Sequence, residues 1–131
     1  MTGIDTNILV RFFAKDDPQQ SPKAKAVLSS LTILEPGWVG TATLLELVRT
    51  MKSTFRMSRS GIAGMLGQLL LREAIVVEQS ATVARALQVY RSGNADFADC
   101  LIAASARGAG CGKTLTFDGI AARDAGMQLI V

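Results

Sequence analysis

Apolar residues recur along this chain with two different spacings. Longer segments repeat them every three or four positions, as in helices with one buried face, whereas short continuous runs are typical of buried strands. The pattern predicts helices over residues 6–14, 21–30, 41 or 43 to about 55, 58–72, 80–92 and 96–107, and a short helix after residue 118. It predicts strands near residues 3–4 and over residues 31–34, 75–77, 115–117 and 127–131. Because strands and helices alternate, we expect an α/β fold with a parallel sheet and helices on both of its faces.

Individual residues support several of these elements. Ser80 and Gly93 are typical of the start and the end of a helix. Residues 100–104 are apolar on every side of their helix, so we expect that helix to be deeply buried. At 131 residues, the chain has the length of one domain, and we expect residues 1–131 to form a single domain.

Composition narrows the class of protein. Hydrophobic residues make up 49% and charged residues 19% of the chain, which is typical of a globular protein. No apolar run reaches the roughly 18 residues of a membrane span, and no secretory signal is evident, so we expect a cytoplasmic protein with no membrane partner. The net charge of +3 favours polyanionic partners only weakly.

The chain contains no histidine and two cysteines, Cys100 and Cys111. The absence of histidine excludes Ser-His-Asp and Cys-His catalysis and most zinc sites. A cytosolic chain should keep both cysteines reduced. Any bound metal must be held by oxygen ligands, which favours Mg²⁺ or Mn²⁺.

The carboxylates fall into two groups. Six lie in turns, beside strands or on a short surface helix, and we expect them to be solvated: Asp16, Asp17, Glu35, Glu73, Glu78 and Asp124. Five remain as candidates for chemistry: Asp5, Glu46, Asp96, Asp99 and Asp118.

Two of the five candidates end predicted strands. Asp5 follows the first strand and Asp118 follows the strand at residues 115–117, and the carboxyl ends of parallel strands are where ligands bind. Asp5 could equally cap the helix that follows it. Asp96 fits a helix N-cap, whereas Asp99 enters a turn that is already apolar, where an acid requires a cation partner.

Glu46 is the weakest candidate from the residue pattern. It falls on the side of its helix opposite Leu44, Val48 and Met51, so amphipathicity alone predicts an exposed glutamate. If Asp5, Glu46, Asp99 and Asp118 nevertheless converge, two carboxylates ~5 Å apart would repel by about 3 kcal/mol. Such a cluster would raise its own pKa values or bind a divalent cation.

Four segments, taken in order, resemble the PIN domain family, and most closely its VapC toxin branch. They are Gly3–Leu9, Leu44–Val48, Asp96–Ala104 and Leu115–Asp118. The order and spacing agree along essentially the whole chain. The resemblance implies a Mg²⁺-dependent endoribonuclease that hydrolyses RNA phosphodiesters with a metal-activated water and leaves 5′-phosphate and 3′-hydroxyl ends.

The resemblance also assigns residues and partners. It implies that Asp5, Glu46, Asp99 and Asp118 are the catalytic, metal-binding acids, with Asp5 and Asp99 as the principal ligands. Asp96 matches an additional acid of part of the family and stays a supporting or capping candidate. Two polar positions, Asn7 and Thr116, match residues that support the acids by hydrogen bonding. A homodimer and inhibition by a cognate antitoxin are expected.

Two alternatives remain open. The first is a PIN-type nuclease that acts in RNA maturation or on DNA without an antitoxin. The second is a catalytically inactive PIN-like binding module, which the four intact acids disfavour.

Other features carry less information. The glycine-rich segment 108–114 has the wrong spacing for a phosphate-binding loop and follows a helix rather than a strand, so we interpret it as a helix end and turn. A basic run comprises Arg49, Lys52, Arg56 and Arg59. It is either a solvated surface or a contact for RNA phosphates or an acidic antitoxin segment.

Overall fold

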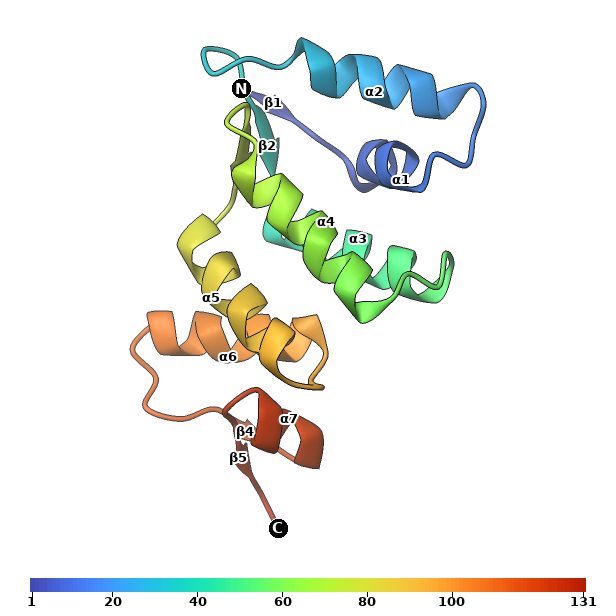
Figure 1. Ribbon diagram of the computed structural model, residues 1–131. Helices are drawn as coiled ribbons and strands as arrows, with labels where there is room; N and C mark the ends of the chain where they lie inside the picture. Colours follow the sequence, from blue (N-terminus) through green and yellow to red (C-terminus); the bar gives the residue numbers. More distant parts are fainter. The chain divides into compact units, whose positions relative to one another are not determined.

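The computed structural model describes all residues from Met1 to Val131 and divides them into two compact units (Figure 1). The first unit is Met1–Glu78 and the second is Gln79–Val131. Each unit contains its own parallel sheet, and each is described by itself below.

The first unit is built on a sheet of three parallel strands. These are β1 (Thr2–Gly3), β2 (Gly37–Val39) and β3 (Ile75–Val77), in the order β1-β2-β3. Trp38 at the centre of β2 is in register with Gly3 on one side and Val76 on the other. Parallel neighbours require long crossover connections, which is why a pair of helices separates each strand from the next.

Four helices complete this unit: α1 (Thr6–Ala14), α2 (Gln20–Ser30), α3 (Thr41–Ser53) and α4 (Arg59–Leu71). Helix α1 packs against α2 and α3, and α4 packs against β3 and α3. The inward faces of α3 and α4 carry Leu44, Leu47, Ile62 and Leu66, whose side chains are at most 1% exposed.

The predicted strand at residues 31–34 is wrong. Ile33 and Leu34 are 68% and 91% exposed, and the strand forms instead at Gly37–Val39. The close packing around Gly37 explains this position. A Cβ atom on Gly37 would lie 2.7 Å from Cδ1 of Leu31 and 3.1 Å from Cγ1 of Ile4, so a larger residue here would require both side chains to move.

The second unit contains three helices and a sheet of two parallel strands. In chain order they are α5 (Ser80–Ser92), α6 (Phe97–Gly108), β4 (Leu115–Thr116), α7 (Gly119–Asp124) and β5 (Gln128–Leu129). Helices α5 and α6 pack extensively on each other. The rings of Tyr90 and Phe97 meet edge to face at the turn between these helices, with centroids 5.8 Å apart.

The expected α/β class with parallel strands is confirmed, and every predicted helix is present. Two predicted details are wrong. Helix α6 is not buried on all sides, because Ile102 is 52% exposed. The predicted strand at residues 115–117 ends one residue earlier, since Phe117 lies outside β4 and is 85% exposed. No helix is long and apolar enough to cross a membrane. The organisation of the chain as a single domain stays a prediction.

Candidate active site

Asp5 lies where the first strand becomes the first helix. Ile4 is buried and carries the chain out of the sheet, and Asp5 then occupies the N-cap position of α1 with an extended backbone (φ −80°, ψ 158°). Its Oδ1 accepts a hydrogen bond of 2.7 Å from the Thr6 N–H. The residue as a whole is exposed, so Asp5 caps the helix and is also accessible to a ligand.

Glu46 lies in the second turn of α3 and is exposed, as the amphipathic pattern predicts. Its neighbours Leu47 and Val48 point into the core. An exposed carboxylate of this kind is compatible both with an ordinary surface glutamate and with a metal ligand.

The start of α6 carries two more of the candidate acids. Asp96 occupies the N-cap position and Asp99 lies in the first turn. Phe97 and Cys100 on either side are 2% exposed, so the turn is partly buried and Asp99 itself is half-buried. The apolar residues beside the two acids in the sequence, Phe97 and Cys100, are the ones that are buried.

Asp118 ends the segment that follows β4 and caps α7. Its Oδ1 accepts hydrogen bonds from the Ile120 N–H at 2.8 Å and from the Ala121 N–H at 3.2 Å. The Thr116 hydroxyl oxygen accepts a hydrogen bond of 3.0 Å from the Asp118 N–H. Thr116 therefore fixes the backbone at the point where Asp118 leaves the strand.

The charges of Asp96 and Asp118 act on the carboxyl of Asp99. The pKa of the Asp99 carboxyl is raised above its ordinary value, first by burial and then by the negative charges of Asp96 and Asp118. None of these causes is a nearby cation, although an acid at the start of a buried helix needs one. A divalent cation beside Asp99 would oppose all three effects, so the environment of this one carboxyl is compatible with an oxygen-liganded metal.

The structure therefore brings together part of the predicted site. Asp96, Asp99 and Asp118 belong to the second unit and interact there, whereas Asp5 and Glu46 belong to the first unit. In neither unit do three acidic or cysteine side chains form a ready set of metal ligands. The convergence of Asp5, Glu46, Asp99 and Asp118 stays a prediction.

Glu78 was predicted to be solvated and is half-buried instead. Its Oε1 accepts a hydrogen bond of 2.8 Å from the Thr41 N–H, at the start of α3. The residue before Thr41 is Gly40, which has no side chain to cap the helix. No local signal predicts this contact, because the two residues are separated by 37 positions.

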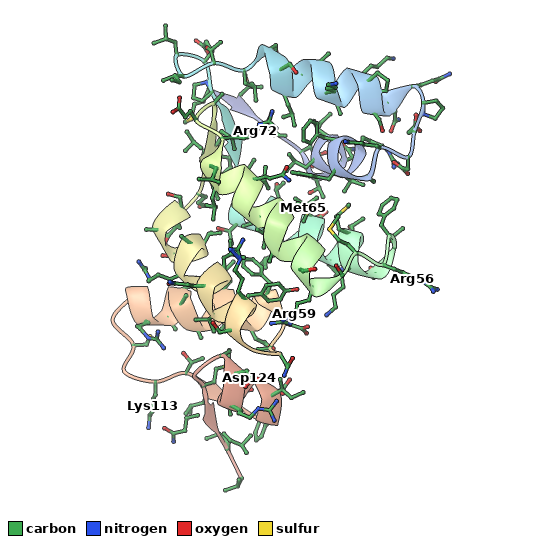
Figure 2. All side chains as sticks on the ribbon, viewed as in Figure 1. Arg56, Arg59, Met65, Arg72, Lys113 and Asp124 are labelled. Carbon is green, nitrogen blue, oxygen red and sulfur yellow. The ribbon has the colours of Figure 1, made fainter.

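Asp124 and Asp17 were also predicted to be solvated, and both bind backbone N–H groups. Asp124 has a side chain only 14% exposed, accepts a hydrogen bond of 2.9 Å from the Asn94 N–H and pairs with Arg123 (Asp124 is labelled in Figure 2). Asp17 accepts hydrogen bonds from the N–H groups of Gln19 and Gln20, which lowers the pKa of its carboxyl. The sequence signal for Asp17 is its place three residues before a helix.

Comparison with known families identifies one match. The model of the family described as "PIN domain" matches residues 4–126, which leaves out three residues at the start and five at the end. The match spans both units. No curated protein matches the chain.

Proposed function

Because the chain belongs to the PIN domain family, whose members are generally metal-dependent nucleases, we propose that it is a Mg²⁺-dependent endoribonuclease of the VapC toxin type. The catalytic and metal-binding residues in this proposal are Asp5, Glu46, Asp99 and Asp118. Asp96 acts beside them as a supporting acid.

The observation that carries the proposal is the environment of Asp99. Its pKa is raised by burial and by two neighbouring carboxyls, so the unliganded protein holds negative charge at an unfavourable position. Carboxyls whose pKa values are shifted by burial and by neighbouring charges are frequent at functional sites. At a position that serves stability alone, such an acid is usually absent or is paired with a cation.

The metal in this proposal is Mg²⁺, with Mn²⁺ as a substitute, since all the available ligands are carboxylate oxygens. When bound, such an ion activates water and stabilises the leaving oxygen in phosphodiester hydrolysis. Asp99 and Asp5 are the proposed principal ligands. Asp118 is held ready by the backbone of α7, because one of its oxygens is fixed by two N–H donors.

RNA is the proposed substrate, and the basic run of α3 and α4 supports this choice. Arg49, Lys52 and Arg56 are exposed, and Arg59 is half-buried at the first position of α4 (Arg56 and Arg59 are labelled in Figure 2). Contacts of these cations with phosphates would make binding dependent on salt and independent of sequence.

The proposed partners are a second copy of the chain and a cognate antitoxin. Exposed apolar side chains in the first unit, including Ile33, Leu34 and Leu71, offer area for such contacts. Light scattering of the purified protein tests the homodimer. Copurification of the native complex, followed by RNA end-mapping after the partner is removed, tests the antitoxin.

The nuclease activity itself is tested with a panel of structured RNAs, incubated with Mg²⁺ and then with Mg²⁺ plus a chelator. We expect cleavage with Mg²⁺ and none with the chelator. We expect the variants Asp5→Asn and Asp99→Asn to lose cleavage, whereas Asp17→Asn, a matched change at a structural acid, retains it. Unchanged cleavage by Asp5→Asn or Asp99→Asn would refute the assignment of the site.

Other outcomes of the same panel identify the alternatives. Cleavage of precursor RNAs or of DNA, by a protein with no antitoxin gene beside its own, indicates a processing nuclease. Absence of both cleavage and Mg²⁺ binding indicates an inactive binding module. Each outcome is distinct from the pattern expected for a toxin.

A further inference from the structure

A cavity of about 230 Å³ lies within the second unit, and none of the candidate acids lines it. It lies between α5 and α6 and beside the turn that precedes β5. Its lining residues are Arg85, Val89, Cys100, Ala103, Ala104, Arg107, Ala125 and Gly126. The small side chains create the space, and the two arginines are its only charged residues.

The arginines approach the cavity from different helices. Arg85, from α5, reaches the end of α6: its Nη2 lies 3.9 Å from the position that a Cβ atom on Gly108 would occupy. The same nitrogen donates a hydrogen bond of 3.2 Å to the Thr82 hydroxyl, which fixes its direction. Arg107, in the last turn of α6, has its Nη2 3.5 Å from the corresponding position on Gly126.

Gly126 allows this close approach. Its φ of +74° is in the left-handed region that glycine adopts readily, and the turn there brings backbone up to the guanidinium of Arg107. A side chain at this position would be strained and would reduce the space in the cavity. The local sequence Ala125-Gly126 therefore keeps the cavity open on this side.

Neither arginine is paired with a carboxylate, and no acidic residue lines the cavity. The carbonyl end of α6 offsets part of the positive charge of the two arginines, but a helix terminus carries only about half a negative charge. Two guanidinium groups leave roughly +1.5 uncompensated. A phosphomonoester carries about −1.5 to −2 charges at neutral pH, which balances this excess.

The donor geometry also favours phosphate over carboxylate. Each guanidinium presents a planar fork of N–H donors. A carboxylate has two oxygens and can satisfy one fork in a bidentate manner, whereas a terminal phosphate has three and can engage two. The cavity is smaller than the roughly 300 Å³ of the smallest typical ligand pockets, so it suits a phosphate group and not a whole large ligand.

We propose that this Arg85–Arg107 cavity is a binding site for a phosphomonoester group, from a free nucleotide or from the 5′-phosphorylated end of an RNA. Asp99 and Arg107 are separated by eight positions of α6, or about 12 Å along the helix axis. The Arg107 side of the cavity is therefore distinct from Asp99, whereas Cys100, which follows Asp99 in the chain, lines the opposite side. This phosphate site does not depend on the proposed nuclease function.

Calorimetric titration without divalent cation tests the site while excluding metal-bridged binding at the acids. The probes are inorganic phosphate, adenosine 5′-monophosphate, and one oligoribonucleotide carrying either a 5′-phosphate or a 5′-hydroxyl. We expect the phosphate probes to bind. A free-nucleotide source predicts tighter binding of the monophosphate, whereas an RNA source predicts tighter binding of the 5′-phosphorylated oligonucleotide.

Variants distinguish phosphate binding in the cavity from nonspecific attraction to the positive charge of the protein. Arg85→Gln and Arg107→Gln should each weaken phosphate binding by about tenfold, the effect of losing a charged hydrogen bond. Arg107→Lys retains the charge but not the planar fork and should also weaken binding. The control, Lys113→Gln, removes one charge from the exposed loop between α6 and β4 and should leave affinity within about twofold (Lys113 is labelled in Figure 2).

Three results would overturn the proposal. The first is no binding of inorganic phosphate or of the monophosphate by the wild-type protein. The second is an equal loss of affinity in Lys113→Gln and in the arginine variants. The third is a lower Tm for Arg85→Gln and Arg107→Gln with unchanged phosphate affinity, which would assign both arginines to stabilisation of the α6 terminus alone.

Discussion

Two acids in this molecule, Asp17 and Asp99, have opposite electrostatic environments. In the α1–α2 turn, Asp16 pairs with Arg11 at 2.9 Å and Asp17 accepts two backbone N–H bonds, so the pKa of Asp17 is lowered. In the α6 cluster, which comprises Asp96, Asp99 and Asp118, the pKa of Asp99 is raised. The hydrogen bonds of Asp17 favour its charged form, whereas burial and the neighbouring carboxyls of Asp96 and Asp118 disfavour the charged form of Asp99.

This difference distinguishes structural from functional acids better than exposure does. Asp5, Glu46 and Asp118 are exposed, and so is Asp16, so exposure alone does not tell functional acids from structural ones. What differs at the α6 cluster is the sign of the interactions around the carboxyl of Asp99. Repulsion of this kind is tolerated where a ligand supplies the missing positive charge.

The largest expected effect comes from Asp118→Asn. Asparagine caps helices about as well as aspartate, so α7 should keep its N-cap and the protein its Tm. Only the negative charge is lost, and RNA cleavage with Mg²⁺ should fall by about a hundredfold or more. Kinetic assays and thermal unfolding of the same samples check both parts. Unchanged cleavage would show that Asp118 has only a structural role as the N-cap of α7.

A smaller effect is expected at Glu78, a structural acid far from the α1–α2 turn. Glu78→Ala removes the bond to the Thr41 N–H and leaves the start of α3 uncapped, at a cost of about 1–2 kcal/mol in the free energy of unfolding. Unfolding in denaturant measures this loss in the free energy of unfolding. Glu78→Gln, which keeps an acceptor oxygen, should recover part of the loss, and equal losses in both variants would show that the hydrogen bond is not the cause.

Asp99→Asn should change stability in the direction opposite to that of a structural acid. Because the folded-state pKa of Asp99 is raised, its ionisation destabilises the folded protein at every pH above the unfolded-state pKa. Without Mg²⁺ at pH 7, the variant should therefore unfold at a slightly higher temperature than the wild type. Added Mg²⁺ should raise the Tm of the wild type more than that of the variant. A lower Tm for the variant without metal would contradict this account.

The smallest effect is expected for Asp17→Asn. The folded-state pKa of Asp17 is lowered, so its stabilisation is present above the ordinary value of 3.8 and is lost as the pH falls through the folded-state value. The variant should have a slightly lower Tm than the wild type at pH 7, and the two should converge in strong acid. A difference that persists unchanged at low pH would exclude ionisation as its origin.

The helices could be predicted well from the sequence, because their periodicity reports one buried face directly. Helix α1 has the predicted bounds, and α4 lies between Ser58 and Arg72, as its pattern indicates. The second strand could not be predicted, because it pairs with strands far away in the chain and Gly37 packs against Ile4, which no local pattern records. Ile102 was misjudged because an apolar run does not say which side of a helix finds a partner.

The residues of the candidate site differ in how well the sequence pattern alone indicates them. Asp5 and Asp118 follow strand ends, a position that the sequence shows, and Asp99 stands out because its turn is apolar. Glu46 could be nominated only through resemblance to the PIN domain family. The structural roles of Glu78 and Asp124 depend on contacts across 37 and 30 positions, which no local pattern records.

The central claim is that the α6 cluster contributes to a divalent-metal site, and the most direct test is a calorimetric titration of Mg²⁺ into the wild type, Asp99→Asn, Asp118→Asn and Asp17→Asn. We expect the wild type and Asp17→Asn to bind Mg²⁺ with equal affinity, and the Asp99 and Asp118 variants to bind at least about tenfold more weakly. Equal Mg²⁺ affinity in all four proteins, or no binding by the wild type, would contradict the claim.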